Sequence, residues 1–229
     1  MGLDMYLYRA RRYKDVTPKD LFAIDAYFEW RNAVENKTAY SKEDHRFYTL
    51  EEWHGIPEES VRKDLLPFYK SELTRCYYDF DREHQYGYDS IMTEITYWRK
   101  ANQIHKWFVN NVQYGVDDCG EYEVTEADLK KLLGLCQEVK EHSELVDGKI
   151  ENGKMIKDGK WVPIIENGKY IKDPSYAQKL LPCAEGFFFG SQNYDQWYLS
   201  EIEYTIEKLT EILDETDFEN EIIMYSSSW

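Results

Sequence analysis

The sequence predicts an α+β fold: a mainly helical single domain, residues 1–229, with N- and C-terminal strands paired in a small antiparallel sheet and a β-hairpin arm inserted at 147–173. Three observations predict it. Segments with strand character stand at both ends of the chain, and most of the sequence between them has helical periodicity. A lysine-rich segment contains two Asn-Gly and two Asp-Gly steps, which favour hairpin turns.

The first strand and the first helix follow from short patterns. Every second residue of GLDMYLYRA, residues 2–10, is apolar up to Leu7, which is the period of a half-buried strand. A helix is predicted for 16–36, because Thr17 is a favourable N-cap and Pro18 occupies the first helical position.

The middle of the chain is also predicted to be helical. Residues 57–80 have helical character, either in two pieces or as one kinked helix, because Pro67 interrupts the backbone hydrogen bonding of a helix. Residues 81–90 are predicted to be a connection. The next stretch, EITYWRKANQIHKWFVNN at 94–111, is longer than an ordinary strand and is predicted to be a helix.

This predicted helix 94–111 carries polar residues on its apolar side. At 100° per residue, Glu94 and His105 fall inside the apolar stripe, and Asn102 lies at its edge. A buried polar group without a partner costs about 1–3 kcal/mol, so each needs a partner from another element. Two interpretations stay open: these side chains are satisfied within a packed core, or this face lines a cleft.

The C-terminal half continues with alternating elements. A helix is predicted for 125–146 with Thr125 as its N-cap, and the arm follows with an internal repeat, ENGKMIKD and then ENGKYIKD. Leucines and isoleucines spaced by three and four residues predict another long helix after Tyr198. The final segment, ENEIIMYSSSW, is predicted to be a strand that pairs with the first one.

Composition limits the classes of partner. With 44 acidic and 28 basic residues the net charge is −16, which argues against extended contact with nucleic acid or an anionic membrane. No apolar run is long enough for a membrane span or a signal peptide, so a cytoplasmic location is expected, in the host cell if the protein is phage-encoded. The four cysteines form no CxxC pair and suit a reducing compartment.

No motif indicates a cofactor, a metal or a catalytic nucleophile. GxGxxG, GxxxxGK[ST], HExxH and GxSxG are all absent, and the five histidines show no metal-ligand spacing. We therefore expect no cofactor and no metal site, and the sequence favours a protein that is not an enzyme.

A candidate ligand site is expected between the helix 94–111 and the aromatic turn that follows Gly186. Aromatic rings would stack on a planar group, amide and imidazole groups would contact its edges, and basic residues would supply charge at the rim. Core packing is the commoner explanation for aromatic residues of this kind. The predicted ligand-binding residues are Trp98, Arg99, Asn102, His105, Lys106, Phe188, Ser191, Tyr194 and Trp197.

Several blocks of the sequence resemble one family. The start MGLDMYLY, the helix EITYWRKANQIHKWFVNN, the turn GFFFGS with YD and WY beyond it, and the terminal SSW are together similar to a family of uncharacterised phage and prophage proteins. The resemblance covers about half of the chain and leaves out the arm and the segment 33–86. The family implies no catalytic residues.

A phage origin implied by this resemblance favours function by binding. The first hypothesis is a counter-defence protein that sequesters a small nucleotide-like immune signal in the aromatic and basic site. The second is an acidic inhibitor or DNA mimic directed at a host protein, such as a defence protein, because ten carboxylates and one lysine lie between Asp195 and Glu221. The third is a nucleotide-processing enzyme with His105 or Asp118 as acid or base. The many aromatic residues also leave room for a homo-oligomeric interface.

Overall fold

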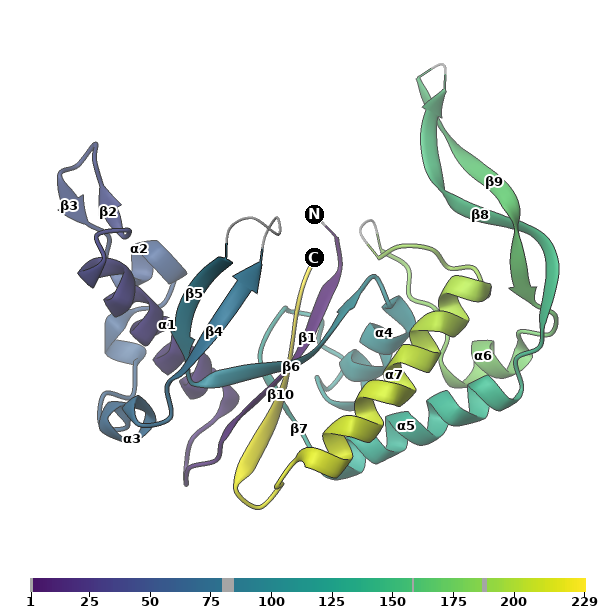
Figure 1. Cartoon of the computed structure of the whole chain (residues 1–229). Coiled ribbons are helices and arrows are strands. Elements are labelled where there is room, and N and C mark those ends of the chain that lie inside the picture. The colour runs from purple at the N-terminus through teal and green to yellow at the C-terminus, as the bar shows by residue number, and fades with distance from the viewer. Residues whose placement is uncertain (1, 80–84, 158, 187–188) are drawn as a thin grey trace.

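A four-stranded antiparallel sheet forms the centre of the computed structural model, which describes residues 2–79, 85–157, 159–186 and 189–229. The strand order is β6 (Met92–Arg99), β1 (Asp4–Arg11), β10 (Glu221–Ser228) and β7 (Tyr122–Val124). The two chain termini therefore lie side by side at the centre of the sheet (Figure 1). This confirms the predicted pairing of the first and last strands, and an α+β fold.

Both faces of this sheet are buried, as the sequence of β10 requires. Ile222, Ile223, Met224 and Tyr225 are consecutive in the strand and all are buried, so successive side chains enter opposite layers. In β1 the apolar positions are more one-sided, because Leu3, Met5 and Leu7 all belong to the same apolar cluster. The sheet is thus the middle of three layers.

The C-terminal helices cover one face. These are α4 (Asn102–Asn111), α5 (Glu126–Glu141), α6 (Ser175–Leu180) and α7 (Gln196–Glu215). Thr125 caps α5 through a capping box, as predicted for that helix. The cluster beneath them contains three of the four largest fully buried side chains among the described residues, namely Trp98, Tyr225 and Phe108. Burial of these apolar side chains stabilises the packing of the C-terminal helices on the sheet.

The N-terminal helices cover the opposite face. The long helix α1 (Pro18–Glu35) begins at Thr17 with a capping box, and α2 (Leu50–His54), the 3₁₀ turn η1 (Glu58–Ser60) and α3 (Leu66–Lys70) follow it. A short two-stranded ribbon, β2 (Tyr40–Ser41) with β3 (Arg46–Phe47), lies between α1 and α2. Leu21, Ile24, Leu50 and Tyr69 form the buried cluster of this layer.

The prediction of one helix over 94–111 is wrong for its first part. Residues 92–99 form strand β6, and α4 begins only at Asn102. Thr, Ile, Tyr and Trp in this stretch fit a pleated surface, and pairing with β1 overrides the helical periodicity. Lys100 separates the two elements, because its φ of 62° is left-handed and incompatible with either.

The prediction for 57–80 is also wrong in part. Pro67 lies near the start of α3 rather than at a break between helices, and 74–79 form strand β4. Strand β4 pairs antiparallel with β5 (Gln85–Ser90), so part of the expected connection 81–90 is a strand as well. Strands therefore contribute more of the fold than the mainly helical prediction allowed.

A register shift in the central sheet determines which face Glu94 occupies. Leu7 pairs with Thr96, but its neighbour Tyr8 pairs with Glu94, so Ile95 is the extra residue of a β-bulge. One extra residue moves all subsequent side chains to the other face. Glu94 consequently lies across from Tyr8 on the face covered by α1, and not under α7 with Trp98.

Residues 145–171 form a second, longer β-ribbon. Strands β8 (Leu145–Lys157) and β9 (Lys160–Ile171) pair antiparallel and extend away from the helices beside α7 (Figure 1). Near the body, Gly148 pairs with Gly168, and a Cβ on Gly168 would lie 2.3 Å from Ile150 Cδ1. The glycine there makes room for the packed isoleucine. We call β8 and β9 together the ribbon.

The left-handed backbone at Lys100 makes a testable prediction. Lys100→Gly should raise the free energy of unfolding by about 0.5–1 kcal/mol, because glycine adopts positive φ without the Cβ clash. Urea unfolding followed by circular dichroism measures it. The matched control is Lys130→Gly within α5, which should lower the same quantity by about 1 kcal/mol. A loss of stability in both variants would show that Lys100 is not a strained junction.

Candidate functional site

Asn102 is fully committed to interactions within the protein. Its Nδ2 donates to the backbone oxygens of Phe189 at 3.0 Å and Ser191 at 2.8 Å, and its Oδ1 accepts from Ala184 N at 2.9 Å. The side chain is 1% exposed. Asn102 thus fixes the loop before α7 against the start of α4, and its amide group is occupied by these bonds.

His105 links three distant parts of the chain. Nε2 lies 3.0 Å from Asp117 Oδ2, and Nδ1 lies 2.7 Å from the Tyr225 hydroxyl. A carboxylate only accepts, so Nε2 donates to Asp117, and Nδ1 shares a hydrogen bond with the Tyr225 hydroxyl. Trp229 Nε1 also donates to Asp117, at 3.1 Å. With both ring nitrogens occupied, His105 joins α4, the loop 112–121 and the last strand.

Asp118, the other residue considered as an acid or base, is likewise engaged. Its carboxylate accepts from the Tyr122 hydroxyl and from Gly120 N. These bonds form a compact turn before β7.

The other predicted ligand-binding residues do not converge on one cavity with these. Trp98 is buried and donates from Nε1 to Thr205 Oγ1 at 3.0 Å, whereas Arg99 and Trp197 are exposed. Lys106 Nζ donates to Cys183 O at 3.2 Å, and the Tyr194 hydroxyl accepts from Cys183 N at 3.2 Å.

The structure does unite part of the predicted set around one loop. Asn102, Lys106, Ser191 and Tyr194 all bind backbone groups of 183–193, so their shared role is to hold that loop. Phe188 lies outside the described residues. The interpretation as satisfied core groups therefore describes Trp98, Asn102 and His105.

A cavity of about 410 Å³ lies elsewhere, between α1, α2, β5 and the face of the sheet that β6 and β1 present to them. Four carboxylates reach it, and the residues identified in its lining include no lysine or arginine. Its lining residues are Tyr8, Phe22, Asp25, Ala26, Glu29, His54, Ile56, Tyr88, Ser90, Met92, Glu94 and Glu121. We call it the carboxylate cavity.

Asp25 is the most perturbed acid of this cavity. Its Oδ1 accepts from Ile91 N at 2.7 Å and from Ser90 Oγ at 2.8 Å. Burial nevertheless raises the pKa of Asp25 to about 6, because the cost of desolvating the carboxylate exceeds the gain from these bonds. Asp25 is therefore close to half protonated at a slightly acidic pH.

The remaining acids give the cavity a strong negative field. Burial also raises the pKa of Glu94 and of Glu121 above the ordinary range. Glu29 lies 3.5 Å from His54 Nε2, and the charge of Lys19 acts on Glu121. One imidazole and one lysine therefore face four carboxylates, so acidic groups outnumber basic ones around the cavity.

Aromatic rings form the walls between these acids. Tyr8 and Phe22 meet edge to face with ring centroids 5.5 Å apart, and Tyr88 also lines the cavity. Burial raises the pKa of Tyr8, with Glu94 as a further cause, so its phenol stays neutral. Faces of electron-rich rings next to carboxylates are the surroundings in which proteins bind organic cations.

A metal ion is a less suitable occupant. Within the part of the chain that the structure describes, no three His, Cys, Asp or Glu side chains are grouped closely enough to hold one. The carboxylates of the cavity are spread around a volume that matches an organic molecule better than a single ion.

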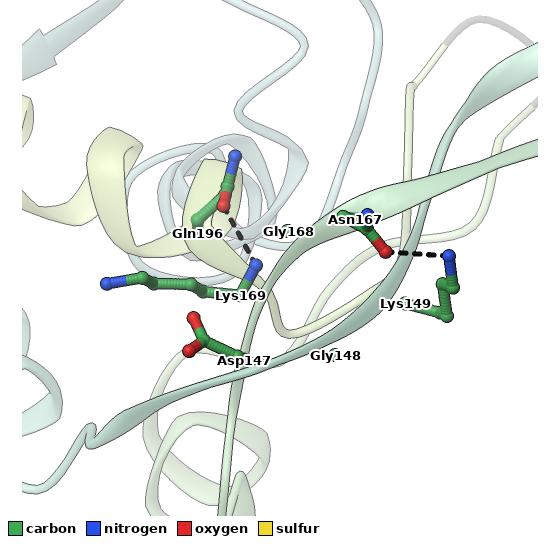
Figure 2. A pocket seen from close by; sticks show the side chains of 7 residues that line it. All are labelled: Asp147, Gly148, Lys149, Asn167, Gly168, Lys169 and Gln196. Atoms are coloured by element: carbon green, nitrogen blue, oxygen red, sulfur yellow. Dashed lines mark hydrogen bonds between the residues drawn. The ribbon is translucent and has the colours of Figure 1, made fainter.

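A second, shallower depression lies at the base of the ribbon. Its volume is about 530 Å³, and Asp147, Gly148, Lys149, Asn167, Gly168, Lys169 and Gln196 line it. Lys149 Nζ donates to Asn167 Oδ1 at 2.6 Å, and Lys169 N donates to Gln196 Oε1 at 2.9 Å. Figure 2 shows the two lysine side chains pointing away from each other. The depression is larger than the carboxylate cavity, but its charged groups do not converge.

Sequence reasoning identified one member of the carboxylate cavity as unusual and missed the others. Glu94 interrupts a predicted apolar stripe, which marks it as unusual. The face of the sheet on which it lies depends on the β-bulge. Asp25 and Glu29 lie one helical turn apart on α1, a spacing common on solvated helix faces. No local pattern marks them as neighbours of β5 and β6.

Comparisons with known proteins find no matching family model, no matching curated protein and no matching solved structure. Within the described residues, no helix has both the length and the apolar content needed to cross a membrane.

The raised pKa of Asp25 gives a prediction about stability and pH. In the unfolded chain an aspartate titrates near pH 4, so this group's stabilising contribution is complete below pH 4 and is lost as pH rises through about 6. Asp25→Asn keeps an acceptor for Ser90 and Ile91 and removes the buried charge. It should raise the free energy of unfolding at pH 7.5 by about 1–3 kcal/mol.

The gain should shrink steadily between pH 6.5 and pH 4, measured by urea unfolding at each pH. Glu59→Gln, at an exposed carboxylate on η1, is the control and should change stability little at any pH. A gain for Asp25→Asn that does not depend on pH would contradict the burial of an ionised Asp25.

Proposed function

We propose that this chain is a non-enzymatic binding protein whose carboxylate cavity takes a small organic cation with ammonium or guanidinium groups. The observation that carries the proposal is the convergence of Asp25, Glu29, Glu94 and Glu121 on one cavity with aromatic walls. Neighbouring carboxylates repel one another, and a bound cation relieves this repulsion and compensates the desolvation of Asp25.

The size of the cavity and the positions of its acids favour an elongated polyvalent cation. A volume of about 410 Å³ is in the range of sites for small organic ligands. Glu94 approaches from the sheet and Glu29 from α1, so separate ammonium groups of one ligand can each meet a carboxylate. Tyr8, Phe22 and Tyr88 suit the methylene segments between them.

Binding without turnover is supported by the hydrogen bonds of the cavity's serine hydroxyl. Ser90 is 3% exposed, and its Oγ is held by Asp25 and by the backbone of Met92. The Ser90 hydroxyl positions the Asp25 carboxylate, and these hydrogen bonds leave it unavailable as a nucleophile. The four carboxylates can bind a cation through charge alone, and such binding needs no nucleophile.

A nucleotide-like anion bound at the ribbon base is the second candidate. The exposed ammonium groups of Lys149 and Lys169 beside Asn167 and Gln196 favour it. In this form the protein would sequester a nucleotide immune signal as a phage counter-defence protein. We rank it second, because the two lysine side chains diverge (Figure 2) and the acidic Asp147 also lines the depression.

Titration calorimetry of the full chain at pH 7.5 tests the proposal. Putrescine, spermidine, agmatine and choline probe the carboxylate cavity, and a panel of mono-, di- and cyclic nucleotides probes the second candidate. At least one cation should bind, and Glu94→Gln should weaken it by about tenfold or more, since one charge-assisted contact contributes at least about 1.4 kcal/mol. Binding should also weaken as pH falls through about 6, where Asp25 becomes protonated.

The matched control is Glu207→Gln on the exposed side of α7, which removes the same charge away from the cavity and should leave affinity within about twofold. Equal weakening of cation binding by both variants would show that the loss of affinity comes from net charge alone. No heat with any cation, together with nucleotide binding lost in Lys149→Ala, would replace the first candidate with the second.

A further inference from the structure

Another cavity, of about 500 Å³, lies between α1, α3 and β5. It is distinct from the carboxylate cavity, since the two share no lining residue among those described. Tyr27, Arg31 and Glu35 are spaced by four residues along α1, so one side of that helix borders the new cavity. Asp25 and Glu29 have the same spacing and border the carboxylate cavity instead. We call the new one the α1–α3 cavity.

Apolar side chains make up part of the lining of the α1–α3 cavity. Tyr27, Phe28, Leu66 and Leu73 are half-buried, and all four pack against the apolar cluster of the N-terminal layer. The rings of Tyr27 and Phe28 meet edge to face with their centroids 6.2 Å apart. These side chains contact the core on one side and border the cavity on the other. The lining therefore suits a ligand that has an apolar body.

Uncommitted hydrogen-bond donors line the same cavity. Arg31 and Lys70 are exposed, and neither donates a hydrogen bond to any residue that the structure describes. Arg31 Nη2 lies 3.8 Å from Glu35 Oε1, which is longer than the roughly 3.2 Å limit of a good hydrogen bond. Asn32 adds an amide, whose Oδ1 already accepts from Asn36 Nδ2 at 2.9 Å, so its Nδ2 is left as a donor.

The two acids in the lining do not neutralise these donors. Asp89 is bound by Arg75, whose Nη1 donates to Asp89 Oδ1 at 3.1 Å. The Glu35 side chain is 69% exposed and makes only the long contact with Arg31. Exposed ion pairs contribute little to stability, so a ligand that forms two hydrogen bonds with the guanidinium can replace Glu35. The cavity thus places donors for an anion beside apolar surface.

We infer that the α1–α3 cavity binds a small organic anion that joins a carboxylate to an apolar body, such as a medium-chain alkanoate. A planar carboxylate matches the parallel N–H groups of Arg31, and Lys70 supplies a second positive charge. The apolar body lies against Tyr27 and Leu66. Inorganic anions lack the apolar body and alcohols lack the charge, so neither satisfies both halves of the site. This inference is independent of the cation proposed for the carboxylate cavity.

Titration calorimetry of the full chain at pH 7.5 with butyrate, hexanoate and octanoate tests the inference. Octanoate should bind at least about tenfold more tightly than butyrate, because each added methylene group is removed from water. Inorganic phosphate and 1-octanol should each bind at least about tenfold more weakly than octanoate, because each lacks one half of the recognised chemistry. Equal affinities for butyrate and octanoate, or for 1-octanol and octanoate, would contradict the inference.

Two single substitutions locate the binding of octanoate. Arg31→Gln and Lys70→Gln should each weaken it by at least about fivefold, because each removes one charge-assisted contact with the carboxylate. The matched control is Lys63→Gln, which removes the same charge from an exposed lysine outside the cavity and should leave affinity within about twofold. Circular dichroism verifies that each variant is folded. No octanoate binding at about 5 mM, or equal weakening in all three variants, would overturn the inference.

Discussion

The antiparallel pairing of β1 with β10 and β6 is the constraint on which the rest of the structure depends. Strand β1 has partners along its length on both sides, so the first and last segments of the chain occupy the middle of the sheet. Because β10 is apolar toward both layers, helices are needed on each face. The N-terminal helices cover one face and the C-terminal helices cover the other, with β6 connecting the two halves of the chain.

This arrangement separates structural polar groups from the candidate functional ones. Under the C-terminal helices, Asn102 and His105 satisfy loop and strand groups and hold the last strand in place. Under α1, the polar groups are acids gathered around a cavity, with the pKa of Asp25 raised by burial. Unlike Asn102, the acids whose pKa is raised by burial lower stability when charged, which is the usual cost of a binding site.

Local sequence patterns were sufficient for the elements that depend on local chemistry. The capping boxes at Thr17 and Thr125 start their helices, and the alternating first strand pairs with the last. Local patterns were insufficient where pairing with a distant strand overrides the local preference. The stretch 94–99 has helical periodicity, yet pairing with β1 and the left-handed Lys100 make it a strand.

Local patterns could not predict the carboxylate cavity, for a related reason. A single extra residue at Ile95 determines whether Glu94 faces α7 or the cavity, and a bulge of this kind depends on the partner strand. The predicted aromatic and basic site placed Trp98 and Arg99 on the same helix as Asn102, but that helix begins only at Asn102. Trp98 and Asn102 consequently belong to different elements with separate partners.

The titration of Asp25 itself is the most direct measure of the account, because the buried carboxylate underlies both the stability and the binding proposed for the cavity. Carboxyl ¹³C NMR of the full chain, assigned with Asp25→Asn, should give a midpoint of about 6 that moves to lower pH when a saturating diamine is present. A midpoint near 4 that the diamine leaves unchanged would contradict both the burial of Asp25 and the proposed cation site.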